Sequence, residues 1–211
     1  MLRRKVLGAM LAAAVVELAA GDACAEDFFA KLNGFEELGS LPAMNPTTGA
    51  FSFPTGAVLS NGTGTASLRL NKAGTMIDYT LTYSDVGTTQ PNTGNVSQAH
   101  IHFGKSRDSG GIMVFFCGTM LTPGPAGTPK CPGDHSGTVT GTWMSSSVIG
   151  PAAQNISPGN FDGLVAALRS NTAYANIHTT PGYPAGEIRG QIRSEDREDQ
   201  DDNHDNHDHR H

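Results

Sequence analysis

The sequence predicts an all-β protein, an antiparallel Greek-key β-sandwich with one short crossover helix. Glycine is abundant, at 26 of 211 residues, and it separates short runs rich in Thr, Ser, Val and Ile. Within these runs apolar and polar residues alternate, which is the period of a half-buried strand. Only one segment has a helical pattern, and repeated strand-helix-strand units would need several helices. These observations favour short strands joined by turns.

The expected strands are justified by alternation and by the turns between them. In 75–83, for example, Ile77, Tyr79 and Leu81 fall on one side and polar residues on the other. The stretch 71–74 ends in glycine and predicts a hairpin turn, whereas 38–60 reads as a long surface loop with at most a short strand at 49–53. The expected strands cover residues 28–35, 62–70, 75–83, 97–103, 112–117, 136–143, 172–178 and 185–193.

The helix is predicted to begin at Ser157 and Pro158, because serine caps helices and proline fits the first turn. Asn171 is the expected end. Its apolar stripe consists of Phe161, Leu164, Val165 and Leu168. With this helix as a crossover, we expect an immunoglobulin/superoxide-dismutase-like sandwich over residues 26–193.

Residues 1–25 have the pattern of a secretory signal peptide. Arg3, Arg4 and Lys5 precede an apolar stretch, 6–16, that is shorter than the about 20 residues needed to span a bilayer. Ala23-Cys24-Ala25 fits a cleavage site, so we expect the mature chain to begin at Glu26 and to be secreted or periplasmic. No later apolar run is long enough to predict a transmembrane segment in the mature chain.

Two cysteines remain after this cleavage, Cys117 and Cys131. In an exported protein an even pair favours a disulfide, and a Pro/Gly-rich loop lies between them. Two buried thiols are the alternative.

The tail, residues 194–211, is predicted to be disordered. It carries eight acidic residues against two arginines, a net charge of −6, which equals the charge of the whole chain. Such a segment is too polar to pack. His204, His207, His209 and His211 are candidates for loose metal binding, and the alternatives are a plain solvated tail or a purification artefact. The near-neutral remainder has no basic patch, so nucleic acid is not an expected partner.

Three histidines are the main candidates for a site. His100 and His102 lie two apart on an expected strand and so share a face, and His178 shares a face with Asn176 on another strand. Imidazoles suit copper and zinc, with His135 or a water as a further ligand. The alternative is a structural role in hydrogen bonds between strands. The ligand-binding candidates on the neighbouring polar faces are Asn176, Glu187, Arg189 and Gln191.

Several of these stretches together resemble a known domain family. They are 99–104 (AHIHFG), 116–117, 137–142, 148–151, 174–180 (YANIHTT) and 184–192 (PAGEIRGQI). In this order they resemble the chordin-type (CHRD) domain over about residues 28–193. The resemblance implies an all-β secreted domain. In animal chordin such domains belong to an extracellular antagonist of bone morphogenetic proteins, and in microbial chains their role is largely undefined.

We therefore expect a non-catalytic binding module whose ligand is an extracellular protein, a cell-envelope component or a metal. One alternative is a copper- or zinc-binding redox protein that uses the three histidines. Another is a structural protein of the cell envelope. Copper and zinc are the candidate cofactors, and the sequence favours a binding role over an enzymatic one.

Overall fold

The structure is a computed structural model that describes residues 25–38, 43–44, 51–52 and 56–195. Its main strands are β1 (Glu26–Asn33), β4 (Thr63–Leu70), β5 (Ile77–Ser84), β6 (Asn95–Phe103), β7 (Ile112–Gly118), β8 (Gly137–Trp143), β9 (Ala173–Thr180), β10 (Ile188–Gln191) and β11 (Arg193–Ser194). A separate pair is formed by β2 (Ala43–Met44) and β3 (Phe51–Ser52). The one α-helix is α1 (Phe161–Arg169), and single 3-10 turns are η1 (Gly34–Glu36), η2 (Ser145–Ser147) and η3 (Ala152–Gln154).

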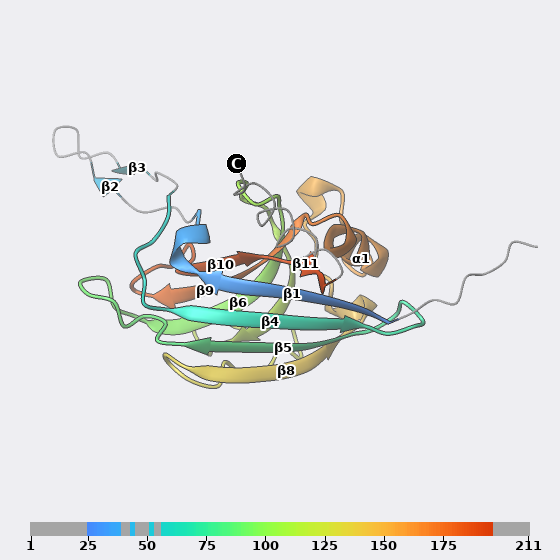
Figure 1. Ribbon diagram of the computed structural model, residues 1–211, viewed down its shortest axis with the longest axis horizontal. Helices are drawn as coiled ribbons and strands as arrows, with labels where there is room; N and C mark the ends of the chain where they lie inside the picture. Colours follow the sequence, from blue (N-terminus) through green and yellow to red (C-terminus); the bar gives the residue numbers. More distant parts are fainter. Residues whose placement is uncertain (1–24, 39–42, 45–50, 53–55, 196–211) are drawn as a thin grey trace, which may run out of the picture.

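Nine strands form one antiparallel sheet. Their order is β7-β6-β9-β10-β1-β4-β5-β8, with β11 also paired to β1 (Figure 1). The prediction of an all-β antiparallel fold with one helix is confirmed. The Greek-key sandwich is not confirmed, because these strands belong to a single curled, nearly closed sheet instead of two separate ones.

Side chains hold together the two ends of this sheet. No backbone ladder joins β7 to β8 in the described residues. Instead, Trp143 on β8 donates its indole Nε1–H to the carbonyl of Phe115 at 2.8 Å. Tyr79 on β5 donates its hydroxyl to the carbonyl of Phe116 at 3.1 Å and stacks on Trp143. The sheet therefore closes into a barrel-like shape through two aromatic side chains.

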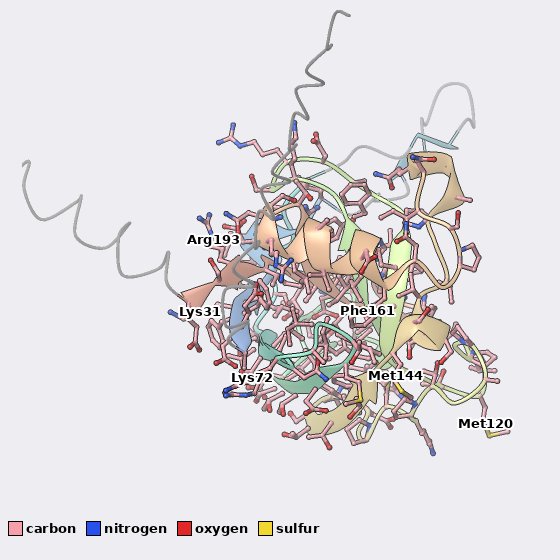
Figure 2. The ribbon with its side chains drawn as sticks, turned by 90° about the vertical axis from the view of Figure 1, so that its right-hand side faces the viewer. Lys31, Lys72, Met120, Met144, Phe161 and Arg193 are labelled. Carbon is pink, nitrogen blue, oxygen red and sulfur yellow. A yellow bond between two sulfur atoms is a disulfide. The ribbon has the colours of Figure 1, made fainter. Side chains whose placement is uncertain are left out.

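The interior is filled by alternate residues of each strand, as the sequence predicts. On β4 and β5, paired from Thr63↔Ser84 to Leu70↔Ile77, every second side chain is buried. The helix α1 contributes its apolar stripe, which includes Phe161, Leu164 and Leu168, to the same core (Figure 2). Asn160 caps it by accepting from the backbone N–H of Gly163, so the cap lies beyond the expected Ser157 and Pro158.

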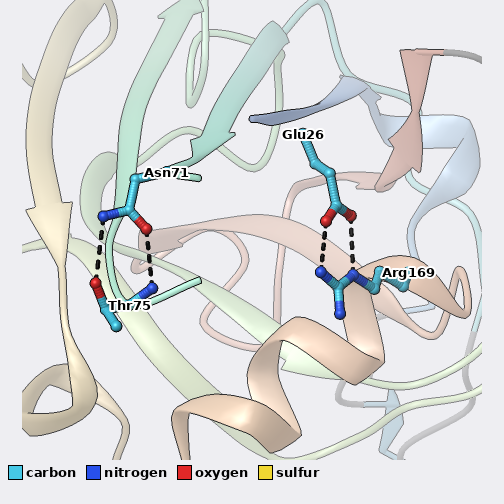
Figure 3. Close-up of polar contacts among 4 residues, drawn as sticks. All are labelled: Glu26, Asn71, Thr75 and Arg169. Carbon is cyan, nitrogen blue, oxygen red and sulfur yellow. Dashed lines mark hydrogen bonds and ion pairs between the residues drawn. The ribbon is translucent and has the colours of Figure 1, made fainter. Parts of the chain in front are cut away.

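Two polar contacts fix the ends of elements (Figure 3). Glu26 at the start of β1 accepts two hydrogen bonds from the guanidinium of Arg169 at the end of α1. Arg169 lowers the pKa of the Glu26 carboxyl through these bonds. Asn71 spans the turn between β4 and β5, where its side chain accepts from the backbone N–H of Thr75 at 2.8 Å. The predicted hairpin at 71–74 is thus held by its own asparagine.

Cys117 at the end of β7 forms a disulfide with Cys131, as predicted, with a Cα–Cα distance of 4.9 Å. The loop it closes extends into solvent, where Met120 is 92% exposed (Figure 2). A disulfide agrees with an oxidising compartment.

The last of the expected strands needs one adjustment. The strand expected at 185–193 is divided, because β10 pairs with β9 while β11 pairs with β1 at Phe28↔Ser194. The sheet therefore extends one residue past 193. The predicted signal peptide, except Ala25, and the tail from residue 196 lie outside the described residues. Within the described part of the chain, no helix combines the length and apolar character needed to cross a membrane.

Candidate functional site

A layer of polar side chains lies on the outer face of the sheet, over β6, β9 and β10. Alternation places Ala99 and Ile101 of β6 in the core, so His100 and His102 project from the opposite face. On β9, Ala175 and Ile177 are likewise in the core. The residues between them, together with β10 residues of the same face, complete what we call the polar layer: His100, His102, Tyr174, Asn176, His178, Arg189 and Gln191.

His100, His102 and His178 meet in this layer, and we call them the histidine cluster. One ring nitrogen from each lies within 4.8 Å of the others. His100 Nδ1 and His102 Nε2 are 2.9 Å apart, and the ring centroids of His100 and His178 are 4.5 Å apart. The register of β6 against β7 shifts on either side of His100 and Ile101. Such bulges re-aim side chains, and they frequently occur beside functional sites.

Backbone carbonyls determine which nitrogen of two of these rings carries the proton. His102 Nδ1 lies 2.8 Å from the carbonyl of Gly110, and His178 Nδ1 lies 3.0 Å from the carbonyl of Pro184. A carbonyl can only accept, so each Nδ1 must carry the hydrogen. In the neutral rings Nε2 therefore carries the lone pair, the arrangement typical of metal-ligating histidines.

The position of the proton on the His100 ring follows from its contact with His102. Because His102 Nε2 is an acceptor, His100 Nδ1 must donate to it, which leaves the lone pair of His100 on Nε2. His100 Nε2 and His178 Nε2 are both buried without a hydrogen-bond partner. Unpaired buried polar atoms are uncommon and costly, so each requires an explanation.

All three rings are kept neutral by burial. Desolvation lowers the pKa of His102 and of His178 to about 4, from 6.5, although their bonds to the carbonyls of Gly110 and Pro184 act in the opposite direction. Burial, followed by the proximity of His178 and His102, lowers the pKa of His100 further still. At neutral pH the cluster therefore offers uncharged imidazoles, which is the form that binds metals.

A stack of rings lies behind His102. Its ring is stacked on Tyr174, with a centroid distance of 4.8 Å and an interplanar angle of 2°. The guanidinium carbon of Arg189 lies 3.4 Å from the centroid of the Tyr174 ring. Arg189 is only 2% exposed, and it donates to the carbonyls of Lys105 and Asp108. It therefore fixes the 104–111 loop, which also supplies the Gly110 carbonyl.

The other ligand-binding candidates are also engaged within the protein. Asn176 donates to the carboxylate of Glu37, and Gln191 donates to the carbonyls of Gly104 and Asn171. Glu187 is fully buried, and its hydrogen bonds are to residues outside the histidine cluster. Its carboxylate accepts from the hydroxyls of Ser60 and Thr179 and from the backbone N–H of Gly87. These side chains connect distant segments.

The histidine at 135 is not part of the cluster. Its Nδ1 lies 2.8 Å from the carbonyl of Val86, and the residue is exposed. The four candidate histidines of the tail lie outside the described residues.

Sequence reasoning missed Tyr174 of the polar layer, and it missed Glu37, which accepts from Asn176. Tyr174 could have been found, because it alternates in step with Asn176 and His178. Glu37 follows η1, and no periodic pattern marks it.

Comparison with known proteins decides the family. A family model described as CHRD domain matches residues 45–192, which is most of the chain. The chain belongs to the CHRD domain family. The resemblance noted in the sequence is thereby confirmed. No curated protein and no solved structure matches the chain.

In this CHRD domain the whole histidine cluster lies inside the matched range, whereas β1 precedes it. That strand is nevertheless integral to the sheet, since it pairs with β4 along its full length, from Glu26↔Leu70 to Asn33↔Thr63.

Proposed function

We propose that this CHRD domain is a secreted or periplasmic binding module that holds one transition-metal ion, copper or zinc, at His100, His102 and His178. One observation carries the proposal. Two imidazole lone pairs, on His100 Nε2 and His178 Nε2, are buried without partners beside a third histidine. A metal ion would satisfy both of these lone pairs.

The cluster would have to tighten around such an ion. A metal bound to imidazoles at about 2.0–2.1 Å separates its ligand nitrogens by roughly 3.4 Å in tetrahedral geometry. One ring nitrogen from each histidine lies within 4.8 Å of the others, which is wider than this spacing. His100 would have to give up its bond to His102 Nε2 and turn, so that the Nε2 lone pairs of all three rings face one ion. The carbonyls of Gly110 and Pro184 would hold the rings of His102 and His178 in orientation.

Metal content is the direct test. The full chain would be purified without chelating resin, with His204, His207, His209 and His211 replaced by Asn so that only the cluster can bind. We expect about one copper or zinc per chain by mass spectrometry. Adding His178→Ala should abolish this binding, while the matched control His135→Ala should retain it. Protein that holds no metal, and whose melting temperature does not change on adding either ion, would refute the proposal.

A second binding role has its own supporting observation. Met120 and Leu121, in the loop closed by the disulfide, are 92% and 88% exposed. Exposed apolar side chains on a braced loop are a common contact for partners. We propose that this loop contacts an extracellular protein or a cell-envelope component. Co-sedimentation with isolated envelopes should fall in Met120→Ser/Leu121→Ser. Equal sedimentation of variant and parent would exclude the loop.

A further inference from the structure

The charge balance of the histidine cluster restricts which ion it can hold. Among the described residues, the cluster consists of His100, His102 and His178, with no carboxylate or thiolate member. The groups that orient two of the rings are backbone carbonyls, which are also uncharged. A bound ion would therefore keep its full charge, because none of these ligands neutralises it.

The surroundings make that charge costly. His100 and His178 are 1% and 6% exposed, so water cannot screen an ion between them effectively. The positive charge of Arg189 lies behind His102, separated from it only by the Tyr174 ring. The cost of burying a charge is large, and in the Born description it rises with the square of that charge. A divalent ion is thus penalised far more than a monovalent one.

The number of ligands that the cluster offers, three imidazoles, also favours a monovalent ion over zinc. Structural zinc normally has four ligands, and catalytic zinc adds water or substrate to three. On one side of the cluster, the ring of Phe115 packs against His100, with a centroid distance of 4.7 Å. Three imidazoles next to an apolar ring suit an ion that accepts three ligands.

We propose that the ion at the histidine cluster is monovalent copper, Cu(I), bound by three neutral imidazoles. This inference rests on the proposed function, since it requires that the cluster binds metal. It adds the identity and charge of the ion.

Competition measurements on the full chain with the four tail histidines replaced by Asn test this inference. Cu(I), kept reduced and buffered by a chromophoric Cu(I) chelator, should bind one ion per chain. Its affinity should exceed that for Zn²⁺ by roughly 100-fold or more. X-ray absorption of the copper-loaded protein should show three nitrogen ligands and no fourth. Tighter binding of Zn²⁺ would overturn the inference but leave the proposed function standing, whereas binding of none of Cu(I), Cu²⁺ and Zn²⁺ would overturn both.

A second measurement tests whether the charge of Arg189 contributes to the preference for Cu(I) over Zn²⁺. Arg189→Gln removes one positive charge near the site, which should help Zn²⁺ more than Cu(I), because Zn²⁺ carries twice the charge. The preference for Cu(I) should fall by about tenfold. The control Lys72→Gln removes a charge from an exposed turn and should leave the preference unchanged. An unchanged preference in folded Arg189→Gln would contradict the electrostatic argument. If that variant does not fold, the comparison of Cu(I) with Zn²⁺ still decides.

Discussion

At the scale of single residues, the protonation of each imidazole follows from one neighbour. Gly110 and Pro184 each offer a carbonyl to an Nδ1, and His102 in turn offers its Nε2 to His100. Each assignment requires the rings to be neutral, and burial keeps them so. The burial that keeps the cluster neutral also makes it sensitive to acid.

We expect the metal-free protein to lose stability between pH 6.5 and about pH 4. In this window the unfolded chain protonates His102 and His178, whose folded pKa is about 4, so acid favours unfolding. Each histidine should lower the free energy of unfolding by up to about 1.4 kcal/mol per pH unit. Urea titrations at several pH values would measure this slope. His178→Gln should reduce it, and an equal slope in that variant would show that His178 does not contribute.

At the scale of elements, the site depends on three adjacent strands and on the loops that cover them. β6 and β9 pair antiparallel from Asn95↔Thr180 to Phe103↔Ala173, so their outward-facing residues lie side by side. Arg189 of β10 holds the 104–111 loop, and that loop orients His102. The three histidines thus come from strands, and the carbonyls that orient two of them come from loops.

The contact between the two ends of the sheet depends on the packing of β5 against β8. Gly141 on β8 offers a test of it. This residue pairs with Tyr79, and a Cβ there would clash with the Tyr79 hydroxyl that donates to Phe116. We expect Gly141→Ala to lower the free energy of unfolding by about 1–3 kcal/mol, because the tyrosine must move and its bond to β7 weakens. Urea denaturation would measure the loss. The control is Gly56→Ala, where a Cβ meets nothing within 4 Å. Equal stability of the two variants would mean that Tyr79 does not hold the seam.

At the scale of the whole molecule, β1 joins the two halves of the sheet. It lies between β10 and β4 (Figure 1). Through Glu26 it is also tied to Arg169 of α1 (Figure 3). On one side of β1 are β10, β9, β6 and β7, which carry the histidine cluster and the disulfide. On the other side are β4, β5 and β8, which complete the core. The aromatic contacts between β7 and β8 then bring the two ends of the sheet together.

The sequence by itself determined what depends on local pattern. Alternation predicted most of the strands and the shared face of His100 and His102, and the cysteine pair predicted the disulfide. The order of the motifs identified the family. Each of these signals lies in residues that are close together in the sequence or in the order of motifs along it. They can therefore be read without knowing which strands pair.

Only the tertiary structure decided which strands are neighbours and what covers them. The pairing of β6 with β9 brings His178 to His100, and alternation within one strand cannot reveal it. The carbonyls of Gly110 and Pro184 set the tautomers, yet a backbone carbonyl has no signature in the sequence. The single curled sheet likewise depends on where β1 inserts and how the strands twist. These features arise from contacts between distant segments, which is why they appear only in the folded chain.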